Sequence, residues 1–384
     1  KFENKEGIVM SINKGLIPML SFMNFNYIYD VAVHEMYHFY GDNMEKYDEV
    51  VKDGANNNER YTAFPKEVMP RVYRKMIYDN LVLAYENPTD EKIYLGKAKY
   101  WNEKWGKEYL DEYNADVVIC THVLAATMVN IMVEKNWIHA TTLGVITDFT
   151  VHPLWEECRS LDYYVTPSEL LEFQLNKKGV DTKKMLSFGI PIKPEFSQRM
   201  DQKEARRKLG IRDNQTTVLL MSGSMGYGKI DESIKRLDEL AFDFQMIVVC
   251  GNNKRLFKKV NQLETKKKIY VYQYVNNVDV MMDASDCIVT KPGGITSSEA
   301  LAKALPMIMV NPIPGHEMRN AEFMLNNGLA LYATKTFPLD EAVFALFKHP
   351  ERVSDMRATL EIFGKRNSTQ NLCEFLVNHK KEGL

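Results

Sequence analysis

Thr290-Lys-Pro-Gly-Gly-Ile-Thr-Ser-Ser-Glu299 is the stretch that says most about the fold. It follows a short apolar run, Cys287–Val289, and opens a segment with helical spacing. A strand that turns through glycines into a helix leaves unpaired backbone N–H groups and the positive end of the helix dipole beside the turn. Gly293 and Gly294 let a ligand approach the backbone, and Glu299 can accept hydrogen bonds from a ribose. Three hydroxyl side chains add donors: Thr296, Ser297 and Ser298.

This stretch therefore predicts a phosphate-binding strand–turn–helix unit, and a tight turn that binds nothing is the alternative. We expect a larger side chain at Gly294 to block the ligand and to leave folding almost unchanged.

Two further glycine-bearing turns follow predicted strands: Met221–Gly228 follows the run 217–220, and Cys250–Asn253 follows the run 246–249. From about residue 114 onward, short β-rich runs alternate with amphipathic segments: 115–120, 141–147, 163–166, 217–221, 245–250, 269–272, 287–290 and 306–310. This alternation predicts two doubly wound parallel sheets. The polar stretch Ser197–Asn214 is the predicted linker, and Phe363–Lys380 is expected to pack back across it.

Composition narrows the class of protein. The 384 residues are 45% hydrophobic and 26% charged, which is ordinary for a globular protein, and the charge sum of 49 − 51 = −2 gives no reason to expect a nucleic-acid partner. Five scattered cysteines without a CxxC pair indicate a reducing compartment and predict neither a disulfide framework nor a thiolate zinc site.

Several strings together resemble the GT-B glycosyltransferases, and most closely the group with monogalactosyldiacylglycerol synthases, processive diacylglycerol glucosyltransferases and the lipid II N-acetylglucosaminyltransferase. The strings that carry the resemblance are Thr290–Ala302, Pro306–Asn320, Gly144–Trp155, Asp162–Val165 and Phe188–Ile192. The resemblance implies an α/β fold with two Rossmann-like units and an interdomain cleft, preceded here by a mainly helical segment. We expect boundaries at 1–112, 113–198 (acceptor side) and 199–384 (donor side).

The resemblance also implies the roles of individual residues. The nucleotide and diphosphate would contact Ser224, Met225, Gly226, Gly251, Asn252, Gly293, Gly294, Ile295 and Thr296. Tyr274 and Val275 would hold the uracil, and Glu299 the ribose. Glu317 and Asn320 would contact the donor sugar. His152 would project into the cleft as a catalytic residue, although a structural histidine is an equal alternative.

The activity that the resemblance implies is inverting transfer of a hexosyl group from a UDP-sugar to a lipid acceptor at an anionic membrane surface. The chain has no Asp-x-Asp pair, so we expect the helix N-terminus, and not a metal, to stabilise the leaving diphosphate. We expect a cytoplasmic protein that is peripheral on the inner face of the membrane. The membrane candidates are the basic run Lys254–Lys268 and the apolar stretch Ile17–Phe25.

A different motif lies near the start, where Val31–His38 contains His-Glu-x-x-His. On a helix, His34 and His38 share a face and can bind one Zn²⁺, with Glu35 as general base and Glu59 as the third ligand. Residues 1–112 thus resemble a segment of a zincin metallopeptidase. The glycine-rich acceptor loop of the glycosyltransferases is not recognisable there. A zinc peptidase, a non-catalytic nucleotide-sugar-binding protein and a chimera therefore remain as alternatives.

Overall fold

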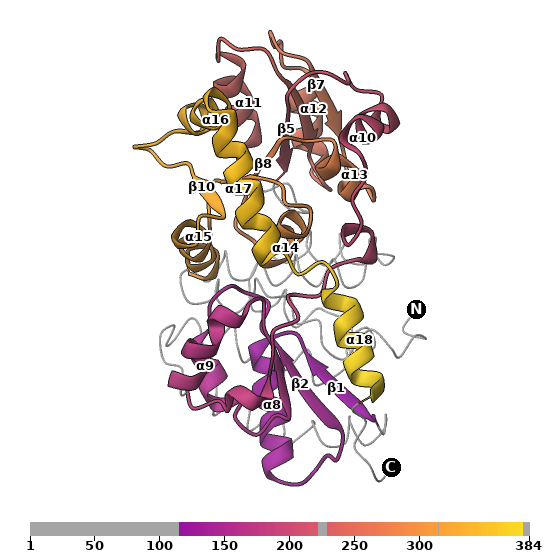
Figure 1. Cartoon of the computed structure of the whole chain (residues 1–384), viewed down its shortest axis with the longest axis vertical. Coiled ribbons are helices and arrows are strands. Elements are labelled where there is room, and N and C mark those ends of the chain that lie inside the picture. The colour runs from indigo at the N-terminus through magenta and orange to yellow at the C-terminus, as the bar shows by residue number, and fades with distance from the viewer. Residues whose placement is uncertain (1–114, 222–228, 314, 379–384) are drawn as a thin grey trace, which may run out of the picture.

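The computed structural model of the chain describes residues 115–221, 229–313 and 315–378. These residues form two units that follow one another along the long axis of the molecule, each built on its own parallel sheet (Figure 1). The helical segment expected before residue 113 lies outside the described residues. None of the described helices combines the length and the apolar composition needed to span a bilayer.

The first unit is a four-stranded sheet in the order β1-β2-β3-β4, parallel throughout. Its elements are β1 (Val117–Cys120), α8 (Val123–Glu134), β2 (Thr141–Val145), η3 (Pro153–Glu157), β3 (Tyr163–Val165), η4 (Glu169–Leu171), α9 (Glu172–Lys177), η5 (Thr182–Lys184) and β4 (Met185–Leu186). β2 is buried at every position, as a central strand covered on both faces must be. A side chain at Gly144 would collide with the Trp155 ring, since a Cβ there lies 2.5 Å from Trp155 Cζ3. Gly144 thus allows the indole of Trp155 in η3 to pack closely against β2.

The second unit is a six-stranded parallel sheet in the order β10-β9-β8-β5-β6-β7. Its elements are α10 (Gln202–Leu209), β5 (Thr217–Met221), α11 (Ile230–Asp238), β6 (Gln245–Val249), α12 (Lys254–Asn261), β7 (Ile269–Tyr272), α13 (Val278–Asp283), β8 (Cys287–Thr290), α14 (Gly294–Ala302), β9 (Met307–Met309), α15 (His316–Asn326), β10 (Ala330–Tyr332), α16 (Leu339–Lys348) and α17 (Pro350–Phe363). The eight predicted strands are confirmed, and the short strands β4 and β10 were not predicted.

The strand order fixes where a ligand can bind. From β5 the chain proceeds outward through β6 and β7, and it then returns to β8 on the other side of β5 and proceeds through β9 to β10. The connections that leave β5 and β8 therefore diverge, and doubly wound sheets bind ligands in the crevice at this switch point. The Gly293–Gly294 turn follows β8 directly.

The predicted linker Ser197–Asn214 is only partly a linker. Residues 202–209 form α10. Asp201 caps the start of this helix, because its carboxylate accepts from the N–H groups of Lys203 and Glu204. Gly210, with φ 64°, caps its end. Arg206 on this helix pairs with Asp286 at 2.8 Å, so the helix belongs to the second unit. Polar composition alone did not distinguish an amphipathic surface helix from a loop.

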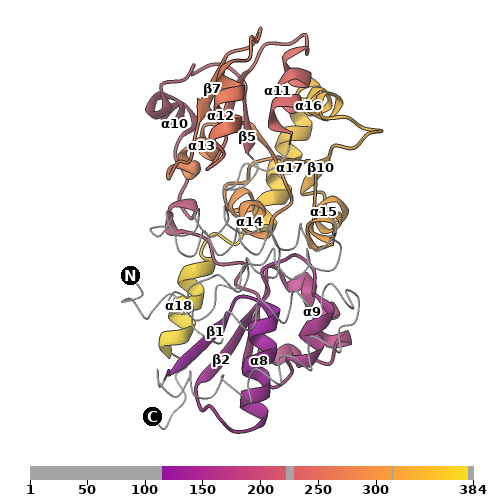
Figure 2. The same cartoon turned by 180° about the vertical axis from the view of Figure 1, so that it is seen from behind.

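The chain end returns to the first unit, as expected. α18 (Ser368–Asn378) lies along the first sheet in both views (Figures 1 and 2). Leu372 packs with Leu143, Val145 and Val165, while the rings of Phe375 and Tyr163 meet edge to face at 4.8 Å. The last helix therefore covers one face of the first sheet and links the two units.

Candidate functional site

The N-terminus of α14 is the centre of the predicted donor site. Gly293 is the N-cap, with φ −77° and ψ 142°, and the helix runs from Gly294 to Ala302. A Cβ added at Gly293 would meet no atom of the other described residues within 4 Å, so among the described residues the space beside this N-cap is open. Backbone N–H groups of a first helical turn, next to open space, form an arrangement that binds anions.

Gly294 has a different role from the one predicted. A Cβ there would lie 2.0 Å from the carbonyl oxygen of Thr147 in the first unit. The two units thus touch backbone to backbone at this point. The expectation that a larger residue at Gly294 would hardly affect folding is therefore wrong, because no side chain fits between the units.

The hydroxyl side chains of α14 are only partly available to a ligand. Ser298 Oγ donates to the Gly294 carbonyl oxygen at 2.8 Å, a common bond for serine inside a helix. Ser297 is fully buried, and its hydroxyl has no partner among the described residues. Thr296 is half-buried and Ile295 is exposed. Of the three predicted hydroxyl donors, only Thr296 remains for a ligand.

Glu299 lies one turn further along α14. Burial raises the pKa of its carboxyl group to about 7, and the positive charge of Lys193 offsets part of this rise. Near neutral pH this group is therefore divided between its protonated and ionised forms. A ligand that donates hydrogen bonds to it would favour the ionised form.

The other predicted nucleotide contacts end neighbouring strands. Gly251 follows β6 in the left-handed region, with φ 57°, and is buried, while Asn252 beside it is exposed. Tyr274 follows β7 and exposes 54% of its surface, and Val275 is half-buried. These four residues share the carboxyl edge of the sheet with the α14 turn. Ser224, Met225 and Gly226 lie outside the described residues.

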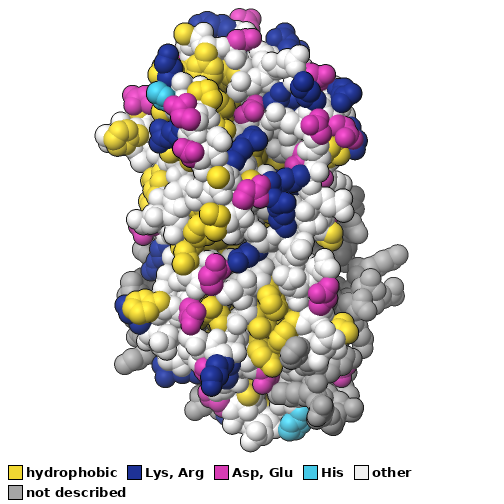
Figure 3. Space-filling view, in the orientation of Figure 1, with side chains coloured by type: hydrophobic (Ala, Val, Ile, Leu, Met, Phe, Trp, Pro, Cys, Tyr) yellow, Lys and Arg dark blue, Asp and Glu magenta, His cyan; other side chains and the backbone are white. Residues whose placement is uncertain are grey.

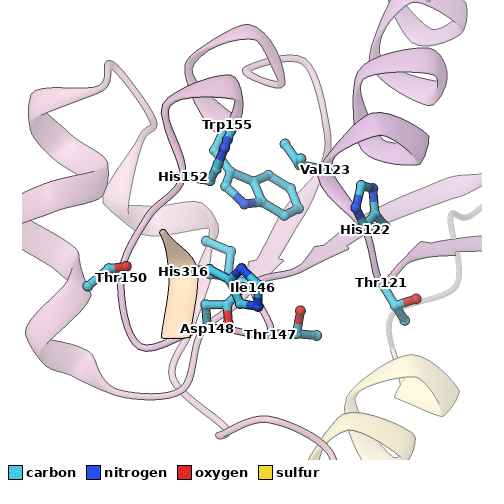
Figure 4. Close-up of a pocket in the computed structure, with 10 residues that line it drawn as sticks. All are labelled: Thr121, His122, Val123, Ile146, Thr147, Asp148, Thr150, His152, Trp155 and His316. Atoms are coloured by element: carbon cyan, nitrogen blue, oxygen red, sulfur yellow. The ribbon is translucent and has the colours of Figure 1, made fainter. Parts of the chain in front are cut away.

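A pocket opens at the carboxyl edge of the first sheet, where it faces the start of α15 (Figure 4). Its lining comes from the loops after β1 and β2, from the start of α8, from η3 and from the start of α15: Thr121, His122, Val123, Ile146, Thr147, Asp148, Thr150, His152, Trp155 and His316. It thus combines polar side chains from both units. The sequence analysis named only His152 from this set. Polar residues directly after the predicted strands 115–120 and 141–147 were the signal that could have identified Thr121, His122 and Asp148.

His152 faces this pocket as a neutral ring. Its Nδ1 accepts a hydrogen bond from the Leu154 N–H at 3.2 Å and so caps η3. Burial, and to a smaller degree the positive charge of Arg319, lower the pKa of His152 to about 4. With Nδ1 as acceptor, the neutral ring carries its proton on Nε2. His152 is therefore placed to donate a hydrogen bond and is poorly placed to act as a base.

Asn320 joins the two units beneath the pocket. Its side chain is fully buried, and its Nδ2 donates to Asp148 Oδ1 at 3.0 Å and to the Pro292 carbonyl oxygen at 3.1 Å. Its Oδ1 accepts from the Phe149 N–H at 2.8 Å. These bonds use both amide protons, so this geometry leaves Asn320 no donor for a sugar. Glu317 is also engaged, because its Oε2 accepts from the Ile313 N–H at 2.6 Å.

Comparison with known proteins identifies the family. Residues 31–192 match the family model of monogalactosyldiacylglycerol synthase, and residues 201–359 match that of glycosyl transferases group 1. The processive diacylglycerol beta-glucosyltransferase of Bacillus cereus (strain ATCC 10987 / NRS 248) is 31% identical over 298 residues, which span 75% of this chain and 76% of the relative. The chain belongs to this glycosyltransferase family. It is a hexosyltransferase of the GT-B type.

Further relatives of this GT-B hexosyltransferase agree. Monogalactosyldiacylglycerol synthase 2, chloroplastic, of Arabidopsis thaliana is 28% identical over 359 residues, which span 82% of this chain and 76% of the relative. The crystal structure of Acinetobacter baumannii MurG has the same fold, with a TM-score of 0.56 and 13% identity over 75% of this chain and 79% of the other.

The resemblance of the start of this glycosyltransferase to a metallopeptidase gains no support. The monogalactosyldiacylglycerol synthase match begins at residue 31 and includes the whole His-Glu-x-x-His motif. His34, Glu35, His38 and Glu59 lie outside the described residues. Within the part of the chain that the structure describes, no group of three or more His, Cys, Asp or Glu side chains is arranged to hold a metal ion.

Proposed function

We propose that this hexosyltransferase takes a hexosyl group from a UDP-sugar and transfers it, with inversion, to a diacylglycerol-type lipid. The names of the curated relatives support a lipid acceptor, since they are diacylglycerol glucosyltransferases and monogalactosyldiacylglycerol synthases. The open N-terminus of α14 at the switch point of the second sheet is the observation that carries the donor half of the proposal.

In this proposal the nucleotide lies along the carboxyl edge of the second sheet. The uracil lies against Tyr274 and Val275, and the ribose hydroxyls donate to Glu299. The diphosphate accepts hydrogen bonds from the N–H groups that follow Gly293, where the dipole of α14 favours negative charge. Gly251 and Asn252 border the nucleotide from β6. Ser224, Met225 and Gly226, which lie outside the described residues, are proposed as further contacts of the diphosphate. Glu317 and the start of α15 border the donor sugar.

Stabilisation of the leaving diphosphate is the main catalytic contribution that we assign to the donor site. As the bond between C1 of the sugar and the diphosphate breaks, negative charge grows on the diphosphate. Preorganised N–H donors stabilise that charge more in the transition state than in the ground state. His152 adds its Nε2–H as a donor from the other side of the cleft. Each of these groups acts without a change in its own protonation.

A lipid acceptor requires contact with a membrane, and the first unit offers a surface for it beside the pocket. Leu170 and Phe173 expose 45% and 66% of their surfaces, and Lys177 Nζ lies 4.4 Å from the Phe173 ring centre. The same helix reaches the pocket loop, since the Gln174 side chain accepts from the Val151 N–H at 3.2 Å. We propose this apolar and basic surface as the contact with anionic lipid.

The basic run Lys254–Lys268 is less suitable for that contact, because several of its lysines already have partners. Lys259 pairs with Asp231 at 2.5 Å, Lys266 pairs with Glu239 at 2.6 Å, and Lys267 donates to two carbonyl oxygens. On the face drawn in Figure 3, charges of both signs are interspersed, and the hydrophobic side chains lie among them.

The test uses the full chain with UDP-glucose or UDP-galactose and vesicles of dioleoylglycerol mixed with phosphatidylglycerol. We expect release of UDP together with a glycolipid of the corresponding mass, and weaker co-sedimentation with the vesicles for Phe173→Glu than for the parent. Ile362→Glu, at a hydrophobic residue of α17 that is 74% exposed, is the matched control and should bind like the parent. Tight UDP binding without transfer to any lipid would favour the non-catalytic alternative.

A further inference from the structure

Asp148 is the one carboxylate among the residues that line the described pocket (Figure 4). It follows β2 at the carboxyl edge of the first sheet, where residues of parallel strands converge. The Asn320 amide donates to Asp148 Oδ1, while Asp148 Oδ2 forms no hydrogen bond with another described residue. One oxygen is thus fixed and the other is free to accept a proton.

The position of Asp148 relative to the donor helix is set by the same amide. Asn320 Nδ2 bonds both Asp148 Oδ1 and the carbonyl oxygen of Pro292, the residue before the open N-cap of α14. Gly294 touches the backbone of Thr147, the neighbour of Asp148, on the other side of this turn. The carboxylate of the first unit is therefore held next to the turn that we assign to the leaving diphosphate.

We propose that Asp148 is the general base that activates the acceptor hydroxyl, and that Asn320 is the positioning residue that orients it from the other unit. This inference rests on the proposed function and adds the identity of the base. His152 does not compete for the role, because its Nδ1 is engaged with Leu154 and its Nε2 carries a proton.

The acceptor hydroxyl oxygen forms a bond to C1 of the donor sugar while its proton passes to Asp148 Oδ2. The bond from C1 to the diphosphate oxygen breaks, and its electron pair leaves with UDP. The products are the inverted glycoside, UDP and a protonated Asp148, which then returns the proton to water.

Asp148→Asn tests the base directly. The asparagine keeps the size of the side chain and an oxygen that accepts from Asn320, so the units should stay joined and the Kd for UDP should stay within about twofold of the parent. We expect kcat to fall by about 10²–10⁴-fold, the usual contribution of general base catalysis. A kcat within threefold of the parent would overturn the assignment.

Asn320→Asp tests the positioning role through the pH profile. The titratable and charged groups around the pocket are His122 after β1, His152 before η3, and His316 and Arg319 on α15, with Lys178 directly after α9. A second carboxylate against Asp148 adds like-charge repulsion that raises the pKa of the base. The acidic limb of the kcat/KM profile should therefore move to higher pH. An equal loss of activity at every pH, without a shift of this limb, would contradict the positioning role.

Thr369→Ala is the matched control, since it removes a different hydrogen bond of the chain end, from Thr369 Oγ1 to the Ile192 carbonyl oxygen. It should leave the pH profile unchanged.

A second readout, the release of UDP when water replaces the lipid acceptor, distinguishes a failure of the base assignment from a failure of the proposed function. If the parent glycosylates no diacylglycerol but hydrolyses UDP-glucose, the lipid assignment fails, and Asp148→Asn should still slow the hydrolysis. If the parent neither transfers nor hydrolyses, both the proposed function and the base assignment are overturned.

Discussion

At the scale of single residues, the pKa values of His152 and Glu299 lead to two pH-dependent measurements. Burial shifts the pKa of both side chains, downward for His152 and upward for Glu299. The contribution of His152 to stability is therefore lost as the pH falls, and that of Glu299 is lost as the pH rises. The direction of each pKa shift predicts the sign of a measurable change, in stability for His152 and in proton release for Glu299.

For His152 the folded pKa of about 4 lies below the ordinary 6.5. Unfolding therefore takes up a proton between these values, and the contribution to stability is present above pH 6.5 and is lost as the pH falls toward 4. The loss is about 3 kcal/mol in all. Urea unfolding at pH 7 and pH 5 should show a smaller decrease in stability for His152→Gln than for the parent. Equal decreases would mean that the ring is not buried in its neutral form.

For Glu299 the pKa of about 7 lies above the ordinary 4.5, so its contribution to stability is present below pH 4.5 and is lost as the pH rises through 7. If the ribose donates to the carboxylate, UDP binding favours the ionised form and releases protons near pH 7. Calorimetry in buffers of different ionisation enthalpy should detect this release, and Glu299→Gln should abolish it. Proton uptake, or no exchange in the parent, would place the ribose elsewhere.

At the scale of elements, the order strand, glycine turn and helix was predicted from sequence, and β8 and α14 confirm it. Two glycines after a buried run and before a helical segment leave few other structures. The distinct roles of Gly293 and Gly294 were not predictable, because the contact with Thr147 joins residues far apart in the sequence. The pocket residue His316 was missed for the same reason, whereas Asp148 could have been identified from its position directly after a predicted strand. Asn320 was assigned to the sugar, although its bonds cross between units.

Gly294→Ala follows from this contact and should destabilise the chain. A Cβ at 2.0 Å from a backbone oxygen forces the units apart, which costs about 1–3 kcal/mol in overpacked interiors. Chemical unfolding should show the lower midpoint. Gly293→Ala should unfold like the parent, because a Cβ there meets no atom of the other described residues within 4 Å. A Gly294→Ala chain as stable as the parent would show that the units do not meet there.

At the scale of the whole molecule, the two units are joined by the crossing of α18, by the Asn320 bonds and by the Gly294 contact. The doubly wound architecture could be predicted from alternating apolar runs. The short edge strands β4 (Met185–Leu186) and β10 (Ala330–Tyr332) were not predicted. The two residues of β4 are too few to form a recognisable pattern.

Phe375→Ala tests the crossing of α18. Its ring packs against Tyr163 and Phe188 of the first unit and is half-buried, so its removal should lower stability by about 1–3 kcal/mol. Val377→Ala on the same helix, at a side chain that is 74% exposed, should change the unfolding midpoint very little. Equal midpoints for the two variants would contradict the packing of this helix on the first sheet.

The central claim is that UDP binds over the open N-cap of α14, and titration of UDP into the parent and into Gly293→Val tests it most directly. Valine is compatible with φ −77°, and a Cβ at this position meets no atom of the other described residues within 4 Å. The variant should therefore fold like the parent, while its branches occupy the path of the diphosphate. We expect a loss of at least about tenfold in UDP affinity, since a charged ligand at a helix N-terminus depends on the dipole and on charge-assisted hydrogen bonds together. Equal affinity of the folded variant and the parent would contradict the donor site.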